Sequence, residues 1–94
     1  MDAIRVISDV GHRVLSTNED HSPKQILRCF IKEGKYGKFL SLEKHWVQNM
    51  SDDNIETRWA RWSVNVPYNK EEALKLSGFM RELIEEAFAS EAAE

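Results

Sequence analysis

Residues 25–47 decide the fold and read, in succession, QILRCFIK, EGKYG and KFLSLEKHWV. In the first and third blocks, successive side chains point to alternate faces, as in β-strands whose two faces meet different surroundings. The middle block, residues 33–37, contains two glycines and is typical of a hairpin turn. The stretch therefore predicts two antiparallel strands joined by a short turn. One face of this hairpin carries Leu27, Cys29, Ile31, Leu40 and Leu42, and the other carries Arg28, Phe30, Lys32, Phe39, Ser41 and His45.

The sequence on either side of this hairpin adds two more strands. Residues 4–15 are rich in β-branched side chains and are interrupted by Gly11, which predicts one bent strand or two short ones. Residues 55–66 alternate again, and Pro67 ends that run because proline cannot donate to a central ladder. Polar loops separate both segments from the hairpin.

The last part of the chain predicts a helix. Asn69 followed by Glu72 has the spacing of a helix N-cap with a reciprocal glutamate. Apolar side chains then recur every three or four residues, as on one face of an amphipathic helix. They are Ala73, Leu76, Met80, Leu83, Ile84 and Ala87. We expect a helix over residues 69–89 and an acidic tail over residues 90–94.

The elements occur in the order β-β-β-β-α and predict an α+β fold. In this fold the long C-terminal amphipathic helix lies on one face of a four-stranded antiparallel sheet. The 94 residues suit a single domain and leave no room for two. Within it we expect an N-terminal strand region and loop over residues 1–23 and a sheet core over residues 24–66. A chain of this size buries a modest core, so a partner subunit would stabilise it.

The sequence also predicts a cellular setting. No apolar run approaches the roughly 20 residues that span a bilayer, and the first ten residues lack the apolar centre of a signal peptide. The single cysteine, Cys29, cannot form an internal disulfide. We therefore expect a cytoplasmic protein with no membrane partner. The position of Cys29 between Leu27 and Ile31 on one strand face favours a buried structural thiol.

The residue types that carry catalysis do not form a recognisable pattern. His12, His21 and His45 lie on three different predicted segments, and the sequence has no Cys-x-x-Cys, phosphate-loop or nucleophile-elbow motif. Asp52 and Asp53 are adjacent but fall among turn residues, which favours a solvated loop. We expect no enzymatic activity, no metal site and no cofactor.

The charge of the chain is unevenly distributed. The net charge of −3 by itself argues against a nucleic-acid-binding protein, because affinity for phosphate comes mainly from Lys and Arg. Residues 24–70, however, carry nine basic and five acidic groups, whereas residues 71–94 carry two basic and seven acidic groups. Seven of the nine aromatic residues lie between Phe30 and Tyr68. A basic segment rich in aromatics indicates a partner with phosphates and stackable bases.

If the helix covers the leucine-rich face, the other face of the sheet presents aromatic rings and cations to solvent. Exposed aromatic side chains at this density mark a contact surface. Unpaired bases stack on aromatic rings, while Arg and Lys neutralise phosphates. For these roles we expect stacking on Phe30, Phe39 and Trp59. The candidate nucleic-acid-binding residues are Arg28, Phe30, Lys32, Lys35, Tyr36, Lys38, Phe39, Ser41, Trp59 and Arg61. The same rings could instead form the core of a dimer, and the sequence leaves both alternatives open.

Three segments resemble the PUR repeat, the unit of purine-rich single-strand-binding proteins. They are KYGKFLSL at residues 35–42, RWSVNVP at residues 61–67 and the helical stretch at residues 76–86. The arrangement is also similar to that of whirly-type folds, which bind single strands. The resemblance implies a homodimer that binds single-stranded DNA or RNA across its sheets. The residues it implicates are Lys38, Phe39 and Ser41, with Arg28, Phe30 and Lys32 on the preceding strand.

Two hypotheses for the function follow. The first is a small homodimeric protein that binds single-stranded nucleic acid by aromatic stacking and phosphate neutralisation. The second is a protein-interaction module, such as a phage- or plasmid-type inhibitor that docks on a host nucleic-acid enzyme through acidic surfaces. The second is motivated by the acidic helix and by the Asp52–Asp53 loop.

Overall fold

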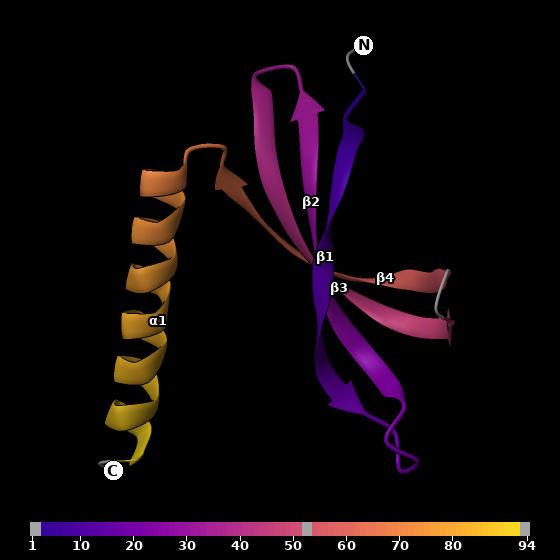
Figure 1. Ribbon diagram of the computed structural model, residues 1–94. Helices are drawn as coiled ribbons and strands as arrows, with labels where there is room; N and C mark the ends of the chain where they lie inside the picture. The colour runs from indigo at the N-terminus through magenta and orange to yellow at the C-terminus, as the bar shows by residue number, and fades with distance from the viewer. Residues whose placement is uncertain (1–2, 52–53, 93–94) are drawn as a thin grey trace.

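Within the part of the chain that the structure describes, four long strands and one helix follow one another in the predicted order (Figure 1). The computed structural model describes residues 3–51 and 54–92. The elements are β1 (Arg5–Thr17), β2 (Pro23–Gly34), β3 (Gly37–Met50), β4 (Ile55–Pro67) and α1 (Lys70–Ala92). The strands form one antiparallel sheet in the order β1-β2-β3-β4. The α+β fold class, with a four-stranded antiparallel sheet followed by one C-terminal helix, is therefore confirmed.

Local sequence explains where these elements begin and end. The side-chain oxygen of Asn69 accepts a hydrogen bond from the backbone N–H of Glu72 at 2.9 Å, so the predicted helix cap is present. The helix runs to Ala92, and residues 90–92, which were expected in the acidic tail, are helical. Gly37 in the β2–β3 turn has a φ of 109°, a conformation that glycine adopts without steric cost. The Asp52–Asp53 pair lies outside the described residues.

The sheet bends strongly along β3 and β4. In Figure 1 the β2–β3 hairpin points up, whereas the β3–β4 hairpin points to the right. The β3–β4 pairing is irregular between Glu43 and His45 and again between Val47 and Asn49. Bulges of this kind bend a strand and increase its twist. The β1–β2 pairing is also irregular between Asp9 and Gly11, and β1 remains one continuous strand.

The buried core lies mainly on the side of the sheet that faces away from the helix. Ile26 is fully buried there, and Phe30 is 9% exposed. The polar residues Ser41, Glu43 and His45 are buried on the same face. We call it the concave face, because the bent sheet folds this side onto itself. The expectation that Phe30 and Ser41 lie on an open surface is wrong, since the bend covers both.

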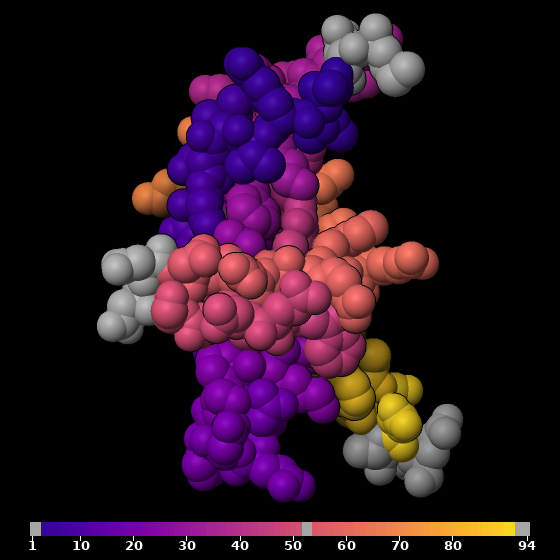
Figure 2. All heavy atoms as spheres, turned by 90° about the vertical axis from the view of Figure 1, so that its right-hand side faces the viewer, coloured from indigo at the N-terminus to yellow at the C-terminus, as the bar shows by residue number. Residues whose placement is uncertain are grey.

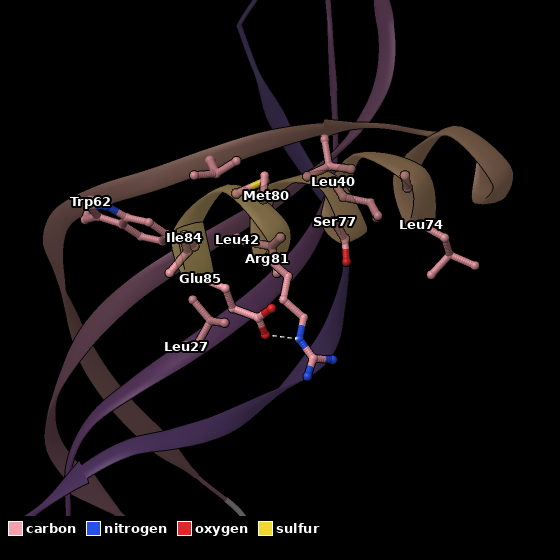
Figure 3. A pocket seen from close by; sticks show the side chains of 13 residues that line it. Leu27, Leu40, Leu42, Trp62, Leu74, Ser77, Met80, Arg81, Ile84 and Glu85 are labelled. Carbon is pink, nitrogen blue, oxygen red and sulfur yellow. Dashed lines mark hydrogen bonds and ion pairs between the residues drawn. The ribbon is translucent and has the colours of Figure 1, made fainter. Parts of the chain in front are cut away.

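The helix lies beside the opposite, leucine-rich face, as predicted, but it does not pack closely on it. A groove of about 650 Å³ separates the two (Figure 3). Met80 and Ile84 line it from the helix. The sheet side is formed by Leu27, Leu40, Leu42, Trp62, Val64 and Val66. We call this space the helix groove; both of its walls are largely apolar.

Large apolar side chains of α1 remain exposed to solvent. Phe79 is 51% exposed, Leu83 64% and Phe88 68%. Across the described residues, no helix combines the length and apolar character needed to cross a membrane.

Candidate nucleic-acid interface

A chain of hydrogen-bonded polar side chains crosses the concave face and uses all four strands. Arg28 on β2 donates to Asp9 on β1 at 2.7 Å and to Thr57 on β4 at 2.9 Å. Oγ1 of Thr57 lies 2.9 Å from Nδ1 of His45 on β3. The other ring nitrogen of His45, Nε2, lies 2.9 Å from Oε1 of Glu43. These bonds explain how polar groups are accommodated in the core, since buried polar groups need partners.

Glu43 is the centre of this network. Its Oε2 accepts a hydrogen bond from Ser41 at 2.7 Å and is ion-paired with Lys32. Burial alone would raise the pKa of Glu43, but hydrogen bonds from Lys32, His45 and Ser41 outweigh it and lower the pKa to about 2. Glu43 is therefore charged at neutral pH and holds the Lys32 ammonium group in place.

The charge on Glu43 determines which ring nitrogen of His45 carries a hydrogen toward it. An ionised carboxylate can only accept hydrogen bonds, so Nε2 of His45 must carry the hydrogen that faces Glu43. Thr57 accepts from Arg28 and can donate its own hydroxyl hydrogen to Nδ1. The hydrogen-bond pattern therefore places a hydrogen on Nε2 of His45, and Thr57 links Nδ1 of the same ring to Arg28.

Phe30 lies within this network and is covered by cations. The Arg28 guanidinium lies 4.6 Å from the ring centroid and the Lys32 ammonium lies 5.7 Å from it. A base cannot stack on Phe30 unless these groups move, so the predicted stacking role of Phe30 does not fit the structure. Arg28 and Lys32 are likewise not free counter-charges for phosphate, because Asp9 and Glu43 compensate them.

Part of the concave face stays open as a cleft of about 420 Å³, which we call the concave cleft. Two aromatic rings line it, those of Phe39 and Trp59. Its polar lining consists of Lys32, Ser41, Glu43, Ser63 and Asn65. Trp59 is 50% exposed, and its indole N–H donates to the carbonyl of Trp62 at 3.3 Å, which orients the ring.

The concave cleft gathers only some of the predicted residues. It brings together Lys32, Phe39, Ser41 and Trp59 from three strands. It adds Ser63 and Asn65, which were not predicted as contacts. The sequence pattern that indicates this placement is the alternation of Ser63 and Asn65 with Trp62 and Val64 along β4. This alternation places Ser63 and Asn65 on the same face as Ser41.

The remaining predicted residues lie at the ends of strands or at a bulge. Tyr36, in the β2–β3 turn, is 94% exposed, and the Lys35 ammonium lies 5.6 Å from its ring. The Lys38 ammonium lies 5.7 Å from the ring of Tyr68, a residue that the sequence analysis did not single out. Arg61 is exposed on the β4 bulge. These residues supply accessible positive charge around the sheet.

Among the described residues, the cysteine and the groups able to bind metal do not form a second centre. Cys29 is half-buried and not fully buried as expected; this partial burial raises the pKa of its thiol, and the nearby Asp9 carboxylate adds to the rise, so the thiol is neutral. Over residues 3–51 and 54–92, no three His, Cys, Asp or Glu side chains are grouped so that they could hold a metal ion. No family model matches the chain, and no curated protein or solved structure is significantly similar to it. The site itself is therefore the basis for assigning a function.

Proposed function

We propose that this protein binds single-stranded nucleic acid and acts as a homodimer. The observation that carries the proposal is the concave cleft, in which the rings of Phe39 and Trp59 line a space that also holds polar side chains. Stacking of a base on an aromatic side chain contributes about 1–3 kcal/mol. Bases of a duplex are already stacked and paired, so an unpaired strand is the form whose bases can enter. The resemblance of residues 35–42 to PUR repeats supports the same function.

The polar lining of the cleft offers both donors and acceptors to a base. Lys32 has three N–H donors and its ion pair with Glu43 occupies one of them. Ser63 and Asn65 add a hydroxyl and an amide. These groups can bond to the edge of a base whose flat side rests on a ring. This combination is typical of sites that hold unpaired bases.

Phosphates would be neutralised from outside the cleft. Lys35 and Lys38 are exposed at the β2–β3 hairpin, and Arg61 is exposed on β4. Arg28 is excluded from this role by its bonds to Asp9 and Thr57. The exposed glutamates of α1 repel phosphates, which directs a strand to the sheet rather than to the helix.

The homodimer is supported by the apolar surface that one chain leaves open. The helix groove and the exposed stripe of α1 both need covering, since apolar area removed from water contributes about 25 cal/mol per Å². The edge strand β1 also exposes Val6 at 57%, Val10 at 59% and Val14 at 49%. Long exposed edges of this kind favour pairing with another chain. A second copy of the chain is the occupant that we propose.

Fluorescence anisotropy tests the binding proposal. The probe is a fluorescein-labelled oligothymidylate of 12 nucleotides, titrated with protein at low salt. Trp59→Ala should weaken binding about 5- to 150-fold, the equivalent of 1–3 kcal/mol. Trp59→Phe is the matched control, because it retains a ring, and it should keep most of the affinity. Equal binding by the two variants, or no saturable binding by the wild-type protein, would overturn the proposal.

One observation favours the protein-interaction alternative. The glutamates at positions 71, 72, 82, 85, 86 and 91 of α1 are all exposed, and exposed carboxylates suit contact with a basic protein. Replacing Glu82, Glu85 and Glu86 with Gln would weaken such a partner. The same change would leave strand binding intact or strengthen it, so the two functions are separable in one variant.

A further inference from the structure

A second cleft opens at the β4 edge of the sheet. It has a volume of about 530 Å³ and is lined by Trp46, Arg58, Trp59, Ala60 and Arg61. We call it the edge cleft, because β4 is an outer strand of the sheet. Trp59 lines both the edge cleft and the concave cleft. The two spaces are therefore neighbours that share one indole ring.

A strained bulge builds the edge cleft. Arg61 has a φ of 60°, in the left-handed region that costs a non-glycine residue of order 1 kcal/mol or more. It lies where the stretch of β4 from Trp59 to Ser63 faces the shorter stretch of β3 from His45 to Glu43. Strict alternation would place Arg58 and Arg61 on opposite faces of the strand. Both arginines nevertheless line one cleft, and bulges characteristically re-aim side chains in this way.

The charges of the edge cleft are not compensated by its own lining, which contains no acidic residue among the described positions. Arg58 and Arg61 are both exposed, and neither takes part in the ion pairs formed among residues 3–51 and 54–92. They differ in this respect from Arg28 and Lys32 on the concave face. A guanidinium group presents its donors in a fork that matches phosphate oxygens. Two such groups beside the rings of Trp46 and Trp59 suit a phosphate that is attached to a flat heterocycle.

We propose that the edge cleft binds a backbone phosphate of the strand whose base occupies the concave cleft. The Trp59 indole then separates a base on one side from a phosphate on the other, and the strand crosses the sheet at β4. This inference rests on the proposed function and adds Trp46 and Arg58 to the binding surface. It also gives a role to the strained arginine at position 61.

The salt dependence of binding tests this assignment. For single strands, the slope of log K against log salt falls by about 0.7 for each phosphate contact that is lost. The double variant Arg58→Gln, Arg61→Gly removes both guanidinium groups, and glycine suits the left-handed conformation at position 61, so the bulge is kept. With the labelled 12-nucleotide oligothymidylate, we expect its slope to be shallower than that of the wild-type protein by about 0.7, the value for one lost phosphate contact.

A charge-matched variant separates a local contact from a general field effect. Arg13→Gln, Lys75→Gln also removes two exposed cations, but from β1 at the opposite edge of the sheet and from α1. Its slope should stay at the wild-type value. Equal slopes for the two double variants would overturn the assignment of the edge cleft even if Trp59→Ala weakens binding and the proposed function stands. Absence of any wild-type binding would overturn both proposals.

Discussion

Nε2 of His45 lies 2.9 Å from Oε1 of Glu43, and this contact joins the two halves of the polar network on the concave face. Beyond His45 the network continues through Thr57 and Arg28 to β1, and beyond Glu43 it continues to Lys32. Loss of either partner leaves buried polar groups without a bond, which costs about 1–3 kcal/mol for each group. The network therefore holds the bent sheet in the shape that opens both clefts.

Acid should destabilise the protein through Glu43. Its folded-state pKa of about 2 is below the ordinary value of 4.5, so the unfolded chain binds this proton first as the pH falls. The resulting stabilisation, on the order of 3 kcal/mol, is fully present above about pH 5 and is lost as the pH falls toward 2. Urea unfolding measured from pH 7 to pH 2.5 should show this decline in the free energy of unfolding.

Two variants assign the acid dependence to its source. Glu43→Gln should lower stability at pH 7 and flatten the decline between pH 5 and pH 2.5, because the titrating group is absent. Glu56→Gln replaces an exposed carboxylate on β4 and should preserve the wild-type profile. A Glu43→Gln profile as steep as that of the wild-type protein would show that other carboxylates carry the effect.

Substitution of Arg28 should lower stability, whereas substitution of the hairpin lysines should alter oligonucleotide binding. The Arg28 side chain is only 14% exposed, and Arg28→Gln removes its bonds to Asp9 and Thr57, so we expect stability to fall by about 1–3 kcal/mol. Lys35→Gln and Lys38→Gln change exposed groups and should alter stability by less than about 0.5 kcal/mol. Each should instead reduce the salt slope of oligonucleotide binding by about 0.7. Thermal unfolding measures the change in stability, and anisotropy on the same samples measures the salt slope. If both lysine variants keep the wild-type slope, the hairpin does not contact the strand.

The helix groove should control oligomeric state. Ile84 lines the groove and is 54% exposed in the single chain. Ile84→Glu places a charge against apolar side chains, which an interface cannot bury unpaired, and it should convert a dimer to a monomer. Light scattering measures the mass directly. Lys75→Glu, an exposed polar position of the same helix, is the control and should remain dimeric; a monomeric wild-type protein would contradict the homodimer.

Local rules account for the parts of the fold that the sequence predicted. The alternation over residues 25–47 and the glycines in the turn specify a hairpin from neighbouring residues alone. Asn69 marks the start of the helix because its side chain caps a backbone N–H three residues away. The composition of the middle segment also pointed to Lys32, Phe39, Ser41 and Trp59, which do meet in one cleft.

Tertiary structure alone decided which of these residues are available to a ligand. A period of two assigns Phe30 to a face, but whether that face is covered depends on the bend of β3 and β4, which arises from bulges that alternation does not reveal. The pairing of Arg28 with Asp9 and Thr57 depends in the same way on the register of strands far apart in the chain. The sequence by itself determined the elements and their faces, because these follow from neighbouring residues. The fold determined the clefts and the ion pairs, because they require contacts between distant residues whose register only the assembled sheet sets.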